Sequence, residues 1–434
     1  MPLLSAARST IRTMGAVEHT LTRPAAAPAD VVAQLEGLRS ARAVRERCHA
    51  VRRWVAAGNS PHFTLADDRL VEVAAFVAEL TRANYPDLAI PPHSRWRHFS
   101  AGGIDRWSGL AKRIDKKDTD ERACVAFDLA VVSVLLDAGA GERWRYREPV
   151  TGQVFARSEG LAVASLDIFA AGGFSSDRAQ PLRVDAPALK TIDDTQIARG
   201  LQAGADNPIV GLDRRVALLR RLGQALEARP DLFGEPARPG HLVDHLLHSA
   251  RDAQVSAPEL LSTLLMVLSP IWPSGLVIDG VNVGDAGLHP AVRTGDATDR
   301  IVPFHKLSQW LTCSLLEPLA MAGLTMVDHD GLTALAEYRN GGLLIDLGVI
   351  KPRRPIVAPQ AASSELVVEW RALTVALIDE LLGPVRERLG LGVEFTLLHL
   401  LQGGTWRAGR EIARALRPPD GPPPIPLVAD GTVF

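Results

Sequence analysis

The chain has 434 residues, of which 47% are hydrophobic and 23% charged, and its formal net charge at pH 7 is −2. This composition is ordinary for a globular protein with a substantial core, and the balanced charge gives the whole chain no bias towards nucleic acid or an anionic membrane. The three cysteines have neither metal-ligand nor CxxC spacing, which favours a reducing compartment. We therefore expect a cytoplasmic protein that binds neither nucleic acid nor membrane.

The chain divides by composition into three parts. Residues 1–30 are expected to form a flexible N-terminus, and residues 419–434 form a Pro-rich tail that is expected to lie extended over the surface. No linker between them is long or polar enough to require a domain boundary. We therefore predict one mostly helical catalytic domain over residues 31–418.

Apolar residues recur at helical spacing through most of this domain. Helices are predicted over residues 31–55 (one or two), 67–83, 122–136, 158–171, 191–226 (two, with a loop at 204–209), 241–251, 258–268 and 363–389. Loops are predicted for residues 93–107, 229–240 and 272–289. Residues 144–157 alternate in part and contain Pro149-Val-Thr-Gly, which predicts a short β-hairpin. The predicted fold class is mostly α with one small β element.

Residues 302–350 are the most informative stretch. An apolar helix carries four polar or aromatic residues, and a second cluster follows the next loop. The first group is His305, Lys306, Gln309 and Trp310, and the second is Glu337, Tyr338, Arg339 and Asn340. Burying polar groups of both signs in so apolar a run is costly without partners. The pattern therefore predicts a pocket for a charged or polar ligand.

Two interpretations of Lys306, Glu337 and Arg339 remain open. They are either a catalytic carboxylate beside cations that bind an anionic ligand, or a structural salt bridge between helices. The residues after them, Gly341 and Gly342, permit a close approach of the backbone to a ligand or a positive φ. This neighbourhood favours the functional interpretation.

Three further groups are candidate pocket residues. The loop from Asp279 to Asp285 contains Asn282 and is flanked by Trp272 and His289, so it either lines a sugar or base pocket or is a solvated turn.

Asp137 precedes a Gly-rich run, which Trp144 and Tyr146 and then Arg157-Ser-Glu159 follow. This group either forms a pocket wall or the Gly run simply ends a helix. The segment from Arg95 to His98, with Asp105, either binds a phosphate or planar group or is solvated.

Several common motifs are not found in the sequence. The Gly-rich runs do not fit a dinucleotide or phosphate-binding loop, and neither a GxSxG elbow nor an HExxH pair is present. His241 and His245 have the spacing of a helical zinc pair, but a surface or capping role is favoured. We expect no metal and no cofactor.

Five stretches resemble the uracil-catabolism protein four family. They are DLAVVSVLLDAGAGERWRYREPVTGQVFARSEGLAVAS, DNPIVGLDRRVALLRRLGQAL, PFHKLSQWLTCSLLEPL, EYRNGGLLIDLGV and LLQGGTWRAGREIA. The likeness runs from about Val31 to the C-terminus. It implies a place in a route that degrades uracil by way of its nucleotide, and it supplies no mechanism.

A fainter resemblance, to the queuosine-nucleotide salvage glycosylases, supplies chemistry. The matching positions are Lys306 in PFHKLSQWL and Glu337-Tyr338-Arg339 ahead of Leu347-Gly348-Val349, and the hairpin and helix from Trp144 to Phe169 match in layout. The resemblance implies a core like that of helix-hairpin-helix DNA glycosylases and hydrolysis of an N-glycosidic bond. This chain has Glu337 where that family has Asp, and Asn-Gly-Gly where it has bulkier residues, which suggests a different substrate.

These observations lead to a hypothesis about function. The chain is predicted to be an N-glycosidase that acts on a ring-opened uridine nucleotide of the ribosylurea phosphate type, without a cofactor. Glu337 and Lys306 are the predicted catalytic residues, and the predicted substrate-binding residues are Arg339, Tyr338, Trp310, His305, Asp137, Asp279, Asn282 and Asp285. The alternatives are an amidohydrolase acting on a ureido intermediate and a non-enzymatic helical scaffold or regulator of the uracil route.

Overall fold

Helices form most of the chain in the computed structural model, which describes residues 28–115, 118–272 and 276–428. They pack around a continuous hydrophobic core that runs from α2 (Ala41–Ala56) to α19 (Trp406–Leu416). The mostly α prediction is therefore confirmed. Most of the predicted flexible N-terminus, residues 1–27, lies outside the described residues.

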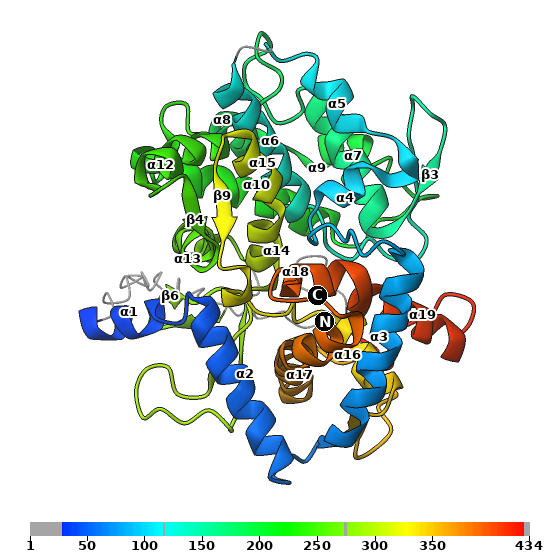
Figure 1. Cartoon of the computed structure of the whole chain (residues 1–434). Coiled ribbons are helices and arrows are strands. Elements are labelled where there is room, and N and C mark those ends of the chain that lie inside the picture. The colour runs from blue at the N-terminus through cyan, green and yellow to red at the C-terminus, as the bar shows by residue number, and fades with distance from the viewer. Residues whose placement is uncertain (1–27, 116–117, 273–275, 429–434) are drawn as a thin grey trace, which may run out of the picture.

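One layer of the fold is built around α17 (Glu365–Leu389), which α2 and α3 (Leu70–Asn84) flank in the lower half of Figure 1. The predicted helical region 31–55 forms two helices, α1 (Ala29–Glu36) and α2. They separate at Gly37–Ser40, where the Ser40 hydroxyl caps α2 by accepting a hydrogen bond from the Ala43 amide.

A second layer surrounds α6 (Thr119–Leu135), in the upper half of Figure 1. Every residue of α6 from Ala123 to Leu135 is buried, as expected of a helix that is apolar on all sides. Its neighbours are α7 (Arg157–Ala170), α10 (Leu212–Glu227), α12 (Leu242–Ser249) and α15 (Leu316–Met321).

Helix α14 (Lys306–Ser314) lies in the middle of the molecule and packs against α6 and α13 (Ala257–Leu268). All its residues after Lys306 are buried. Its first turn is anchored by Asp285, whose Oδ2 accepts a hydrogen bond from the Lys306 amide at 3.1 Å. Both oxygens of Asp285 also accept hydrogen bonds, each 2.8 Å long, from Arg371 of α17. This buried ion pair therefore ties α14 to α17.

Shorter helices complete the fold. They are α4 (Trp96–Phe99), α5 (Arg106–Ala111), α8 (Ala186–Thr191), α9 (Asp194–Gly200), α11 (Pro230–Phe233), α16 (Tyr338–Asp346) and α18 (Leu397–Leu400). Single turns of 3₁₀-helix lie at Asp67–Arg69, Ala101–Gly103, Pro239–His241, Ser269–Ile271 and His329–Gly331, and a π-turn lies at Leu401–Thr405. The loops predicted at 93–107 and 229–240 thus contain short helices, and the helices in 397–416 were not predicted.

The strands are short and paired in twos. The predicted hairpin is confirmed as β2 (Tyr146–Arg147) with β3 (Val154–Phe155). The other described pairs are β1 (Phe63–Leu65) with β10 (Ile350–Pro352), β4 (Gln254–Ser256) with β9 (Thr325–Val327), β5 (Val277–Ile278) with β6 (Val281–Asn282), and β7 (Ala286–Leu288) with β8 (Ile301–Pro303). The sequence predicted one β element, whereas the described residues form five pairs of strands. Strands of three residues are too short to show a clear alternation of polar and apolar residues. The pairs β1–β10 and β4–β9 also join segments that are far apart in the sequence.

The Pro-rich tail is packed against the domain rather than spread over its surface, as far as residue 428. Ile425 is buried, the Gly421 carbonyl accepts a hydrogen bond from Arg339, and Gln360 exchanges backbone hydrogen bonds with Pro426 and Val428. No helix in the described residues is long and apolar enough to cross a membrane.

The Asp285–Arg371 pair gives a prediction about stability. Asp285→Asn leaves the Arg371 guanidinium, whose side chain is 3% exposed, without its carboxylate. We expect the free energy of unfolding in urea to fall by about 3–5 kcal/mol. The matched control is Glu46→Gln in the exposed Arg42–Glu46 pair, for which we expect a loss below about 1 kcal/mol. Equal losses in the two variants would contradict this role for Asp285.

Candidate active site

A cavity of about 350 Å³ lies where the two helical layers meet. The loop after α6 and the start of α7 line one side, and α14, α16 and α19 line the other. Tail residues 420–423 and Leu427 complete the wall. The volume is within the range of small-molecule sites.

The cavity brings together six of the ten predicted site residues, which are Asp137, Lys306, Trp310, Glu337, Tyr338 and Arg339. They come from three elements that are far apart in the sequence. The other four, His305, Asp279, Asn282 and Asp285, are not among the described residues that line it.

Glu337 is held at the start of α16, where it is the N-cap residue. Its Oε2 accepts a hydrogen bond from the Arg339 amide at 2.8 Å, and its Oε1 accepts one from the Asn340 amide at 2.5 Å. The side chain is buried, with Glu337 8% exposed. Burial raises the pKa of Glu337 above its ordinary value, although the two amides and the charge of Lys306 act in the opposite direction.

Lys306 lies at the N-terminus of α14 and is partly buried. Burial lowers the pKa of its ammonium group, against the opposing charge of Glu337 and, more weakly, of Asp137 and Asp285. Both carboxylates of the cavity therefore act electrostatically on the same ammonium group. An ammonium with a lowered pKa is a better proton donor than an exposed lysine.

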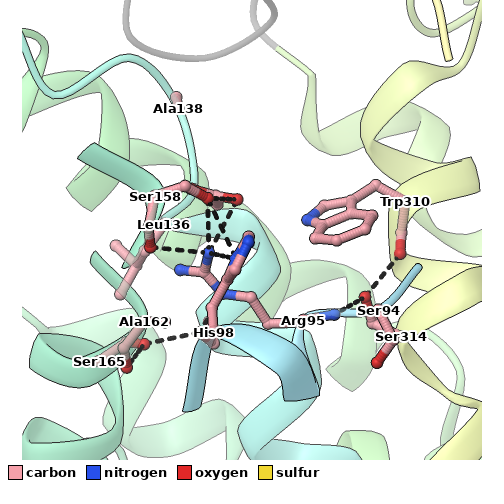
Figure 2. A network of polar contacts seen from close by, with 12 residues as sticks. Ser94, Arg95, His98, Leu136, Ala138, Ser158, Ala162, Ser165, Trp310 and Ser314 are labelled. Carbon is pink, nitrogen blue, oxygen red and sulfur yellow. Dashed lines mark hydrogen bonds and ion pairs between the residues drawn. The ribbon is translucent and has the colours of Figure 1, made fainter. Parts of the chain in front are cut away.

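Asp137 lies just after α6 and forms an ion pair with Arg95. Arg95 itself belongs to a buried polar network with His98 and Ser158 (Figure 2). Arg95 is fully buried, and its Nη1 lies 2.8 Å from Asp137 Oδ2, while the Ser158 hydroxyl donates to Asp137 at 2.7 Å. Burial alone would raise the pKa of Asp137, but the charges of Arg95 and His98 and the Ser158 hydrogen bond outweigh it and lower the pKa. Asp137 is thus held as a carboxylate, and the Gly-rich run after it forms a cavity wall.

Aromatic rings form another part of the wall. Trp310 of α14 lies 4.3 Å from the His93 ring and 6.0 Å from the His98 ring, measured between centroids, and Trp406 of α19 lies 6.3 Å from His98. Burial lowers the pKa of both histidines to about 4. They are therefore neutral near pH 7 and present flat, weakly polar surfaces to a ligand.

Two arginines outside the ten predicted site residues also line the cavity, and one of them, Arg157, belongs to the group around Asp137 that was considered as a pocket wall. Arg157 begins α7, and Arg410 lies on α19 with its guanidinium 4.6 Å from the centre of the Trp406 ring. Both lie inside stretches quoted for the family resemblance, and no local pattern marks Arg410.

The double glycine after Asn340 has a packing role. A Cβ on Gly341 would lie 2.6 Å from Trp370 and Thr374 of α17, and one on Gly342 would lie 3.2 Å from Pro424. Neither glycine has a positive φ or lines the cavity. The predicted approach to a ligand is therefore not what these glycines provide, since they let α16 pack closely against α17 and the tail.

The four remaining predicted residues have other contacts. Asp285 pairs with Arg371, and the His305 Nε2 lies 3.0 Å from the Leu38 carbonyl oxygen. Asp279 and Asn282 belong to the β5–β6 hairpin, where Asp279 occupies the turn with a φ of 46° and the Asn282 side chain accepts a hydrogen bond from the Gly284 amide. The solvated-turn interpretation fits Asp279.

For most of the segment from Arg95 to His98, the interpretation as a binding site for a phosphate or planar group does not hold. Arg95 is a buried structural partner of Asp137, and Arg97 pairs with Glu317 at 2.8 Å. His98 alone in this segment lines the cavity. Within the described residues, no group of three or more His, Cys, Asp or Glu side chains is placed to hold a metal ion.

This chain is similar to known proteins along most of its length. A family model described as "Protein of unknown function (DUF1688)" matches residues 37–434. Protein urg3 of Schizosaccharomyces pombe is 39% identical over 382 residues, which are 86% of this chain and 92% of that protein. Uracil catabolism protein 4 of Lachancea kluyveri is 36% identical over 418 residues, or 87% and 93% of the two chains. The chain therefore belongs to the DUF1688 family, and it is similar over most of its length to uracil catabolism protein 4.

Proposed function

We propose that this protein is a hydrolase of uracil catabolism that cleaves the N-ribosidic bond of a ring-opened uridine nucleotide. The substrate would be of the ribosylurea phosphate type, and the products would be ribose 5-phosphate and urea or a ureido acid. The place in uracil catabolism is supported by the relative that carries this name. The reaction is supported by the contents of the cavity.

The observation that carries the proposal is that Glu337 and Lys306 line one cavity. They are 31 positions apart in the sequence and lie at the N-termini of two different helices. A scaffold would not require a buried carboxylate and a partly buried ammonium to line the same cavity, because removing charged groups from water is costly. A catalytic site can use the carboxylate as a base and the ammonium group as a proton donor.

Cleavage of an N-riboside passes through a transition state in which positive charge develops at the anomeric carbon. In our proposal the Glu337 carboxylate faces this carbon, stabilises the charge and takes a proton from the attacking water. The Lys306 ammonium donates a proton to the leaving ureido nitrogen as the bond from carbon to nitrogen breaks. Water thus supplies the oxygen of ribose 5-phosphate, and the two side chains then exchange the proton through solvent.

Asp137 adds a second carboxylate to the cavity. Its lowered pKa and its ion pair with Arg95 keep it ionised, whereas burial raises the pKa of Glu337. Carboxyl groups whose pKa values are shifted in opposite directions divide the roles of a glycosidase site between them. We assign Asp137 to fixed electrostatic stabilisation of the sugar and Glu337 to proton transfer.

We also propose that the protein has a core like that of the helix-hairpin-helix DNA glycosylases. The confirmed hairpin β2–β3 followed by α7, and α16 with Glu337 as its cap, are the elements that carried the resemblance. A glutamate in place of aspartate extends the carboxylate by one methylene group. This extension suits a substrate that is smaller than a nucleotide with an intact base.

The reaction is tested by incubating purified protein with synthetic ribosylurea 5-phosphate and measuring urea. We expect the wild type to release urea and Glu337→Gln to lower kcat by at least about 100-fold, because the amide cannot accept a proton. Lys306→Met should lower kcat as well. The control is Glu227→Gln on the exposed surface of α10, which should keep full activity. No urea from the wild type, or full activity in Glu337→Gln, would refute the proposal.

A second test is the pH dependence of kcat/KM. Glu337 must be ionised to act as a base, and because its pKa is raised, activity should fall with decreasing pH at a point above the ordinary glutamate value of about 4.3. Lys306 must be protonated, and because its pKa is lowered, activity should fall with increasing pH below the ordinary lysine value of about 10.4. The expected profile is a bell that belongs to the coupled pair. A profile that is flat between these limits, or an unchanged alkaline limb in Lys306→Met, would contradict these roles.

A further inference from the structure

We propose that Arg157, Arg339 and Arg410 form a subsite for a phosphate monoester within the cavity. The three side chains come from the start of α7, the first turn of α16 and the middle of α19, and all three line the same space. The inference rests on the proposed function for the identity of the riboside, but recognition of phosphate can be tested separately.

Arg157 is close enough to Arg339 and Arg410 for their charges to repel its own. The pKa of Arg157 is lowered by burial and then by the charges of Arg410 and Arg339. Like charges held together in a partly buried site are unfavourable unless an anion compensates them. Their convergence therefore indicates a site that is completed by an anionic ligand.

The protein itself supplies little of that compensation. Arg410 pairs with Glu159 at 3.1 Å. Among the described residues, no carboxylate lies within ion-pair distance of Arg157 or Arg339. Two further carboxylates that line the cavity, those of Glu142 and Asp420, belong to exposed residues.

The guanidinium groups also retain donors for a ligand. Arg157 Nη1 and Arg410 Nε are buried nitrogen atoms without a hydrogen-bond partner in the described structure. Arg339, which is 7% exposed, uses Nη1 to donate to the Gly421 carbonyl at 2.7 Å and lies over the Tyr338 ring. Planar guanidinium groups bind phosphate through pairs of parallel hydrogen bonds, and several of them together favour a dianion over a single carboxylate.

The backbone at Arg157 supports a functional role. Its φ is 56°, in the left-handed region that a branched or long side chain seldom adopts. Such strain is unfavourable and persists where the surroundings impose it, often at ligand sites. Glycine would adopt this φ without strain, so an arginine here fits a role for its side chain.

The position of Arg339 relates the subsite to the reaction. Arg339 follows Glu337 by two residues, and the Glu337 carboxylate accepts a hydrogen bond from the Arg339 amide. Both side chains line the same cavity, so one ligand can contact both. The subsite would therefore hold the 5-phosphate while the anomeric carbon lies at Glu337.

The experiment is titration calorimetry with ribose 5-phosphate, ribose, inorganic phosphate and 3-ureidopropionate. We expect the wild type to bind ribose 5-phosphate at least tenfold more tightly than ribose or 3-ureidopropionate. Arg157→Gln and Arg410→Gln should each weaken ribose 5-phosphate binding by at least tenfold and leave the weak ribose binding unchanged. The control is Arg42→Gln on the exposed face of α2, which should bind as the wild type does.

Binding of ribose 5-phosphate no tighter than that of ribose would overturn the subsite, as would unchanged binding in both variants or a preference for 3-ureidopropionate. Melting temperatures show whether each variant is folded. Arg157→Gln is a mild change, because the buried Nη1 of Arg157 has no hydrogen-bond partner to lose in the described structure. Phosphate-dependent binding without urea release would support the subsite and refute the hydrolase. Urea release from unphosphorylated ribosylurea at the same kcat/KM as from its 5-phosphate would support the hydrolase and refute the subsite.

Discussion

The capping of α16 by Glu337 determines the arrangement of the cavity. The carboxylate accepts the amide hydrogens of Arg339 and Asn340 and so begins the helix, while the same carboxylate faces the cavity. An N-cap is usually a small polar residue that only satisfies backbone donors. Here the cap has a second consequence, because it orients a buried acid and places the Arg339 guanidinium two residues further along the same wall.

The remaining polar groups are positioned by ion pairs between the layers. Asp285 and Arg371 tie the start of α14 to α17 and so locate Lys306. Arg95 and Ser158 hold Asp137 on the opposite side. Buried pairs of this kind are weak contributors to net stability, but breaking one is costly. Their effect here is to fix the Asp137 carboxylate and the start of the helix that carries Lys306 beside the cavity that Glu337 also lines.

The sequence predicted the helices and part of the site because both depend on local patterns. Lys306, Trp310 and Glu337 could be singled out as polar or aromatic groups within apolar runs, and the structure places all three at the cavity. The Asp279–Asp285 loop was singled out by composition alone, and Asp285 is instead the partner of Arg371. Composition does not distinguish an anchoring carboxylate from one that faces a ligand.

Other features could not be predicted from local patterns. The pairs β1–β10 and β4–β9 depend on which distant segments meet. Arg157 and Arg410 resemble any surface arginine until α7 and α19 are placed beside α16. The Pro-rich tail was predicted to be extended, yet residues 420–423 line the cavity, because Gly421 accepts a hydrogen bond from Arg339.

The central claim is that one cavity holds a phosphorylated riboside with its anomeric carbon at Glu337. The most direct measurement is a crystal structure of Glu337→Gln with ribosylurea 5-phosphate bound. The account predicts that the phosphate contacts Arg157, Arg339 and Arg410 and that the side chain of residue 337 faces the anomeric carbon. A ligand bound outside the cavity, or bound with its ureido group at the arginines, would contradict it.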